Sequence, residues 1–197
     1  MTLSEHLIYA VLWLSFGVAH SVLASARAKS VLSALGSSYR LAYNWIAALH
    51  VAAVWLIGKT FLATNATSWS LPQVLDLVLW AGAVAGALIL LLAFRAYDTG
   101  KFLGLSQYKE KTSIDAMDNE PLSVGGLNRY MRHPLYTGAI LLLFCVVRDE
   151  FSLATACWAT AYFIVGAAFE EKRLIARYGQ DYLDYRQRVP MFIPKPW

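Results

Sequence analysis

The chain has 197 residues, of which 58% are hydrophobic and 15% are charged, whereas charged residues make up about 25% of an average soluble domain. This deficit, together with 14% aromatic residues, argues against a soluble enzyme and indicates an integral membrane protein. The two cysteines lie in apolar runs, so a disulfide scaffold is excluded as well.

Apolar runs long enough to cross a bilayer, which takes about 20 residues, recur along the chain. They lie at about 5–24, 41–62, 72–94 and 151–169, and a shorter run of 13 residues covers 135–147. We interpret 134–147 and 151–169 as a helical hairpin whose first arm is short and begins or ends inside the protein. The predicted fold is all-α: five transmembrane helices, a C-terminal hairpin of the fourth and fifth, and a cytoplasmic C-terminal helix.

Positive charge is concentrated on one side of these spans. Fifteen of the 17 Lys and Arg residues fall in 25–40, 95–133 and the C-terminal tail, and only Lys59 and Arg148 fall elsewhere. The positive-inside rule then predicts a cell inner membrane protein with its N-terminus outside and its C-terminus in the cytoplasm. Because acidic residues are interleaved with the basic ones, we expect contact with the lipid bilayer and no nucleic-acid partner.

We expect residues 1–197 to form a single membrane-embedded domain with cytoplasmic segments at 95–133 and 170–197. The first of these is the longest polar stretch, and loops of such length are often functional, for example as lids. Within the third predicted span, GAVAG at 82–86 is a small-xxx-small pattern that predicts close packing between helices.

Charged and polar residues gather where the fourth predicted span begins, in RYMRHPLYTG at 129–138. Pro134 suits the first position of a helix, which places His133 near the N-cap. A helix N-terminus favours an anion, and Arg129 and Arg132 add positive charge to it. This end of the span is therefore a candidate anion site.

The partner helix offers the opposite charge, because Glu170 and Glu171 stand at its cytoplasmic end. Together the two arms would suit a zwitterionic ligand. The residues alone leave other interpretations open: a cytoplasmic anchor for Arg132 and His133, a solvated face for the glutamates, or interfacial belt positions for aromatic residues such as Tyr136.

The motifs at these positions resemble a known group of enzymes. RHPLYTG at 132–138, followed by a hairpin and EEKRLIARYGQDYLDYRQRVPMFIP at 170–194, resembles the isoprenylcysteine carboxyl methyltransferase superfamily of small membrane enzymes. FGVAHSVLASARAKSVL at 16–32, YDTGKFLGLSQ at 97–107 and VPMFIP at 189–194 look like the methanethiol S-methyltransferases and the related NnrU-like proteins.

This resemblance implies a methyltransferase that uses S-adenosylmethionine and needs no metal. Its pattern puts cofactor contacts on His133, Tyr136 and Glu171, with Arg132, Pro134 and Glu170 nearby. We expect His133 and the helix N-terminus to hold the cofactor's carboxyl end and Glu171 to hold its ammonium. The implied acceptor is a small thiol such as methanethiol, and the alternative is an isoprenylcysteine carboxylate or another lipid-like group.

Two further residues are candidates for the chemistry itself. Arg129 could lower the pKa of an acceptor thiol, and His20, which belongs to the resembled N-terminal pattern, could line the acceptor pocket. The histidines also support a second hypothesis, a non-covalent haem held by His20 or His50 together with His133, as implied by the NnrU-like resemblance. A third is a membrane scaffold without chemistry.

Overall fold

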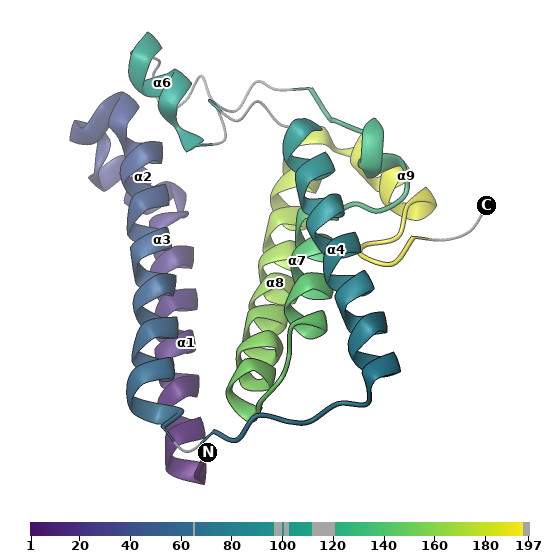
Figure 1. Cartoon of the computed structure of the whole chain (residues 1–197). Helices are drawn as coiled ribbons and strands as arrows, with labels where there is room; N and C mark the ends of the chain where they lie inside the picture. Colours follow the sequence, from purple (N-terminus) through teal and green to yellow (C-terminus); the bar gives the residue numbers. More distant parts are fainter. Residues whose placement is uncertain (65, 97–99, 101–102, 112–120, 195–197) are drawn as a thin grey trace. The chain divides into compact units, whose positions relative to one another are not determined.

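The computed structural model describes residues 1–64, 66–96, 100, 103–111 and 121–194 (Figure 1). Over these ranges the chain is helical, and the sole β-type pairing is an isolated bridge between Ser68 and Asp149. The predicted all-α class is confirmed. The chain divides into two compact units, Met1–Ala66 with Tyr97–Glu120, and Thr67–Ala96 with Pro121–Trp197.

The first unit is built on the packed helices α1 (Leu3–Leu23) and α3 (Tyr39–Ile57). A capping box begins α1, in which the Thr2 hydroxyl accepts from the Glu5 N–H and the Glu5 carboxylate accepts from the Thr2 N–H. Tyr9, Trp13 and Phe16 are buried at helical spacing along α1. The unit also contains α2 (Ala26–Val31), the 3-10 helix η1 (Ser33–Ser38), the π-helical turn η2 (Gly58–Leu62) and α6 (Leu105–Glu110).

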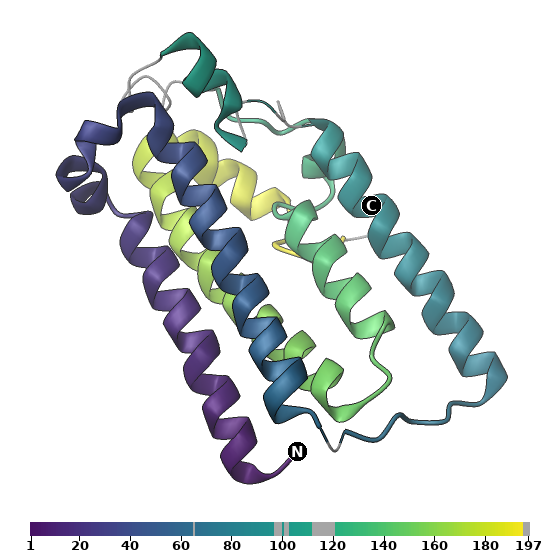
Figure 2. The ribbon, with the colours of Figure 1, turned by 60° about the vertical axis from the view of Figure 1, so that its left-hand side comes forward.

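The second unit contains α4 (Gln73–Ala96), the 3-10 turn η4 (Gly126–Arg129), α7 (Pro134–Cys145), α8 (Glu150–Tyr178) and α9 (Gln180–Arg188). Figures 1 and 2 both show α7 between α4 and α8. The predicted hairpin is therefore present as α7 and α8. Helix α8 continues beyond the predicted apolar run, which ends at 169, so Glu170 and Glu171 belong to the partner helix as predicted.

Gly179 separates α8 from α9. Its φ of 56° lies in the region that costs glycine little, so the chain can turn there and begin α9. This helix matches the predicted C-terminal helix. Its tyrosines Tyr182 and Tyr185 are buried with Val189 against residues near the end of α8.

Glycines allow α4 and α7 to pack closely. A Cβ on Gly86 would lie 2.7 Å from the backbone nitrogen of Leu142, and one on Gly138 would lie 2.9 Å from the carbonyl oxygen of Gly86. On the same face of α4, a Cβ on Gly82 would lie 2.5 Å from the sulfur of Cys145. The close packing predicted from GAVAG is thus confirmed, and it fixes α7 against α4.

Arg148 satisfies the backbone where α7 ends. Its guanidinium donates to the carbonyl oxygens of Cys145 and Val147, at 2.9 and 2.8 Å, and forms an ion pair with Asp76 at 2.8 Å. The Trp69 N–H donates in turn to the Arg148 carbonyl at 2.7 Å. The last carbonyls of a helix lack partners within the helix, so this arginine allows α7 to stop after 12 residues.

Among the described residues, four stretches are long and apolar enough to cross a bilayer: Leu3–Leu23, Ser33–Leu62, Gln73–Arg95 and Glu150–Tyr178. Many of their large apolar side chains are exposed, including Val74, Leu77, Val84 and Leu88 on α4, which suits contact with lipid. The membrane class is therefore supported, while the count of five spans stays a prediction because α7 is short.

The predicted lid at 95–133 includes residues 97–99, 101–102 and 112–120, which lie outside the described residues, as do residues 195–197 of the predicted segment 170–197. The lid stays a prediction.

Candidate functional site

The beginning of α7 is built as the sequence predicts. Pro134 occupies the first turn, where its missing N–H costs nothing, and His133 is the N-cap residue. His133 is buried, with 6% of its surface exposed. Its imidazole ring stacks on that of Tyr136, with centroids 5.4 Å apart, and Tyr136 stacks in turn on Phe163 of α8 at 5.1 Å.

The C-terminal segment 189–192, here called the strap, holds this helix start in place. The Arg132 N–H donates to the carbonyl of Pro190 at 2.9 Å, and the His133 N–H donates to the carbonyl of Met191 at 3.1 Å. The Thr137 hydroxyl donates to the carbonyl of Phe192 at 3.0 Å. The strap therefore satisfies N–H groups that precede α7 and cannot bond within it.

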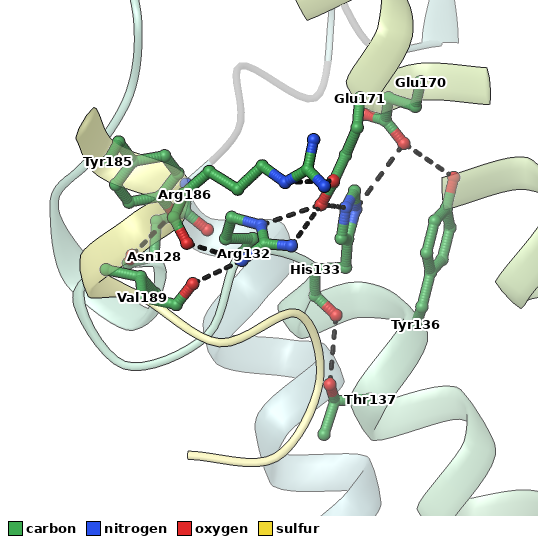
Figure 3. Close-up of polar contacts among 10 residues, drawn as sticks. All are labelled: Asn128, Arg132, His133, Tyr136, Thr137, Glu170, Glu171, Tyr185, Arg186 and Val189. Carbon is green, nitrogen blue, oxygen red and sulfur yellow. Dashed lines mark hydrogen bonds and ion pairs between the residues drawn. The ribbon is translucent and has the colours of Figure 1, made fainter. Parts of the chain in front are cut away.

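An ion cluster with a buried centre lies beside the helix start, and its outer member Arg186 has a side chain that is 48% exposed (Figure 3). Its centre is the carboxylate of Glu171, whose side chain is 5% exposed. Oxygen Oε1 accepts from Nε and Nη2 of Arg132, both at 2.7 Å, and faces Nε2 of His133 at 3.2 Å. Oxygen Oε2 faces Nε of Arg186 at 3.6 Å. We use "ion cluster" below for Arg132, His133, Glu171 and Arg186.

Arg132 also connects the ion cluster to α9. Its remaining nitrogen Nη1 donates to the carbonyl of Arg186 at 3.2 Å and to the carbonyl of Val189. One guanidinium thus joins the Glu171 carboxylate to the carbonyls that end α9. Burying a charge is costly unless it is paired and hydrogen-bonded, and the Arg132 side chain, 8% exposed, meets both conditions.

Glu170 lies beside the ion cluster in a different environment. Its side chain is 40% exposed, and its Oε2 accepts from the Tyr136 hydroxyl at 3.0 Å and faces Nδ1 of His133 at 3.7 Å. Both ring nitrogens of His133 therefore face glutamate carboxylates. The neighbouring glutamates differ in use: Glu171 is enclosed by cations, whereas Glu170 is partly open to solvent.

The structure brings together the six residues predicted to bind the cofactor: Arg132, His133, Pro134, Tyr136, Glu170 and Glu171. The two predicted catalytic residues lie on other elements, Arg129 on η4 and His20 on α1 of the first unit. Arg129 is exposed on η4, and its side chain makes no hydrogen bond or ion pair within the described part of the chain. The contacts between Arg129 and an acceptor stay a prediction.

His20 belongs to the other unit, where it has neutral partners. Its ring is hydrogen-bonded to the Tyr43 hydroxyl and packs against Phe16 at 5.6 Å between centroids. His50 pairs with the Ser15 hydroxyl at 3.2 Å. All three histidines named as possible haem ligands thus have side-chain partners within the protein.

Sequence reasoning missed the contributions of α9 and the strap. Arg186, Val189 and Tyr182 all belong to the stretch YGQDYLDYRQRVP at 178–190, which was used for its resemblance alone. The spacing of Tyr182 and Arg186 places both on one face of a helix. That spacing could have predicted an amphipathic helix with these two residues on its packed face, because the opposite side of the same stretch is polar.

The fold and the site together define an all-helical membrane protein with a charged site where a helical hairpin meets the C-terminal segment. Searches found no matching family model and no matching solved structure. Several curated proteins do match. Methanethiol S-methyltransferase 2 of Bradyrhizobium diazoefficiens is 41% identical over 70 residues, 35% of this chain and 27% of that protein.

The methanethiol S-methyltransferase of Mycobacterium tuberculosis is 37% identical over 71 residues, 36% of this chain and 29% of its own. That of Pseudomonas deceptionensis is 27% identical over 124 residues, 61% of this chain and 45% of its own. The chain thus covers less than a third of the length of the first two relatives. The expected resemblance to methanethiol S-methyltransferases is confirmed, over about a third of the chain.

Proposed function

We propose that the chain is a membrane-embedded methyltransferase that transfers a methyl group from S-adenosylmethionine to a small thiol, with methanethiol as the model acceptor. The observation that carries the proposal is the meeting of RHPLY and the glutamate pair in one buried site, in a chain whose relatives are named for thiol methylation. An isoprenylcysteine carboxylate or another lipid-like group is the alternative acceptor.

The charged and polar groups of the site fit a zwitterionic methyl donor. Glu170 and the Tyr136 hydroxyl face one another and would receive an ammonium, since the Glu170 carboxylate is partly open. Buried Glu171 would support this contact by holding His133 and Arg132 in place. When bound, S-adenosylmethionine supplies an electrophilic methyl group on a sulfonium.

The protein's own task is to align the reactants and to exclude water. The thiol first loses its proton, and methyl transfer from the sulfonium to the thiolate then removes one positive and one negative charge, so an enclosed apolar pocket favours the reaction. The stacked rings of His133, Tyr136 and Phe163 would form an apolar wall for that pocket. We further propose that Arg129 stabilises the acceptor thiolate and that His20 lines the acceptor's path.

We propose that the chain crosses the inner membrane five times, with its N-terminus outside and its C-terminus in the cytoplasm. We also propose that residues 1–197 act as one domain. A helix of 12 residues is about 18 Å long, whereas a hydrocarbon core is about 30 Å thick. The turn and loop of residues 146–149 would complete the crossing. The hydrogen bonds from the Arg148 side chain to backbone carbonyls would satisfy the polar groups of this non-helical segment.

Single-cysteine variants at Thr67 and Gln187, with Cys145 and Cys157 replaced by alanine, test this topology. In intact cells, an impermeant thiol reagent should label the cysteine at 67 and spare the one at 187. Labelling at 187 alone would show that the orientation is the reverse of the proposed one.

The test of function is transfer of labelled methyl from S-adenosylmethionine by purified protein in detergent. Small thiols and a prenylcysteine analogue are offered in parallel, and an absorption spectrum is taken from the same sample. We expect label in a volatile thioether, lost in Glu171→Gln and kept in Glu110→Gln, a control on exposed α6. Label in the prenyl compound would show that the acceptor is lipid-like rather than a small thiol. A Soret band without any transfer would favour haem binding instead.

A further inference from the structure

The strap is anchored unevenly along its length. Val189, where it begins, is 6% exposed and packs in the buried core that joins α9 to α8. Beyond it, Pro190, Met191 and Phe192 are half-buried, and Ile193 is 80% exposed. The described residues that follow Val189 therefore stay outside that core.

A few contacts with the start of α7 hold the rest of the strap in place. Its carbonyls accept hydrogen bonds from the N–H groups of Arg132 and His133 and from the Thr137 hydroxyl. The ring of Phe192 lies 5.9 Å from that of His133, measured between centroids. Segments with few buried apolar contacts open locally at a lower cost in free energy than packed helices do. We therefore expect the strap to open more readily than the helices of the site.

The Thr137 hydroxyl is suited to act as a reversible latch. It lies 3.0 Å from the Phe192 carbonyl of the strap and 3.1 Å from the His133 carbonyl that precedes its own helix. A threonine hydroxyl in a helix can bond to the carbonyl four residues earlier, so this hydroxyl keeps an acceptor when the strap leaves. Opening then creates no unpaired hydroxyl, which would be costly.

The strap lies against groups that are closed off from solvent. His133 is 6% exposed, and the side chains of Arg132 and Glu171 are 8% and 5% exposed. A small-molecule ligand is mostly enclosed when it is bound, and methyl transfer from a sulfonium gains from the exclusion of water. We therefore expect one wall of the site to move when the ligand enters or leaves.

The other walls of the site are held more tightly. Helix α7 packs so closely on α4 that a Cβ on Gly86 or Gly138 would meet backbone atoms of the facing helix. Helix α9 is held by Tyr182 and Tyr185, which are buried with residues near the end of α8. Within the strap itself, by contrast, Val189 is the one buried residue.

We propose that the strap is the gate of the methyl-donor site. It swings about Val189 to admit the donor and to release the product, and the Thr137 hydroxyl holds it closed with the Phe192 ring beside His133. This inference rests on the proposed function, to which it adds a conformational step and a latch residue.

The experiment measures how fast S-adenosylhomocysteine, the demethylated product, enters and leaves the purified protein in detergent. Surface plasmon resonance gives the association and dissociation rate constants. Thr137→Val keeps the shape of the side chain and removes the hydroxyl, whereas Thr137→Ser keeps a hydroxyl. Thr60→Val is the matched control, because the Thr60 hydroxyl donates to the carbonyl of Leu56, four residues earlier, at 2.7 Å in the other unit.

Thr137→Val should raise both rate constants about fivefold, the effect of one net hydrogen bond on an equilibrium. The dissociation constant should stay the same, because the closed strap loses the same bond with and without ligand. Thr137→Ser should restore the wild-type rates, and Thr60→Val should leave them unchanged. If Thr137→Val does not fold, Phe192→Ala removes the ring contact instead and should also raise both rate constants.

Two results would overturn the gate and leave the proposed function standing, because the ligand still binds. Faster dissociation with an unchanged association rate would make the strap a fixed wall that touches the ligand. Unchanged rates with a lower melting temperature would give the strap a structural role alone. If the wild type does not bind S-adenosylhomocysteine, the proposed function fails, and the gate fails with it.

Discussion

The two units hold their histidines in different ways. In the first, His20 and His50 are paired with the neutral hydroxyls of Tyr43 and Ser15 across α1 and α3. In the second, His133 is buried against the carboxylate of Glu171, which is paired with Arg132. A neutral hydrogen bond between membrane helices contributes modestly to stability, whereas breaking a buried ion pair is strongly destabilising. Among the interactions of the described residues, the ion pair in the second unit should therefore be the more costly one to break.

The largest effect should come from removing the central charge of the ion cluster. Glu171→Gln leaves Arg132 buried without its counter-charge, so the free energy of unfolding should fall by about 3–5 kcal/mol and methyl transfer should be lost. Ser15→Ala, which removes the partner of His50, should cost about 0.6 kcal/mol. Chemical denaturation in detergent measures both.

The adjacent glutamate provides the sharper contrast. Glu170→Gln should weaken the binding of the methyl donor about tenfold, the equivalent of about 1.4 kcal/mol. The stability of the protein should change little, because the Glu170 side chain is 40% exposed. Equal stability losses in Glu170→Gln and Glu171→Gln would remove the distinction between a ligand contact and a structural charge.

A second effect on stability, smaller than that of Glu171→Gln, concerns the packing that fixes α7. Gly86→Ala should lower the free energy of unfolding by about 2 kcal/mol, because the new Cβ would lie 2.7 Å from the backbone nitrogen of Leu142. Gly166→Ala on α8 is the matched control: its Cβ meets nothing within 4 Å, and replacing a helical glycine by alanine should stabilise by up to about 1 kcal/mol. Thermal unfolding of both variants checks the difference.

The first unit offers a test of participation in the reaction. If His20 lines the acceptor's path, His20→Ala should raise the KM for the thiol about tenfold, a loss of about 1.4 kcal/mol of binding, without altering the affinity for S-adenosylhomocysteine. Tyr43→Phe removes the hydroxyl partner of His20 and should have a smaller effect. Normal kinetics in His20→Ala would confine the chemistry to the second unit.

The smallest change is expected at Arg129. If it stabilises the thiolate, Arg129→Ala should move the rising limb of the pH–rate profile upward by about one pH unit, since a nearby cation lowers the pKa of an acid by about that amount or more. Arg173→Ala, at an exposed position on α8, is the control. An unchanged profile in Arg129→Ala would remove the residue from the chemistry.

Some features of this protein are determined locally and could be predicted from the sequence. Apolar runs become helices because, in a membrane, backbone groups must be satisfied within the segment. Pro134 fixes the start of α7 and GAVAG allows close packing, because both act through backbone geometry. The predicted hairpin also brings the first residues of one helix beside the last residues of the other. The proximity of RHPLY to the glutamate pair could therefore be predicted as well.

The division of roles among those residues was decided by the tertiary structure. The resemblance implied that Glu171 rather than Glu170 would hold the cofactor's ammonium, yet Glu170 is partly open and Glu171 is enclosed by Arg132, His133 and Arg186. The strap likewise depends on contacts between the segment that follows α9 and the start of α7. Burial and pairing depend on which distant segments meet, and they determine whether a charge stabilises the fold or remains open to a ligand.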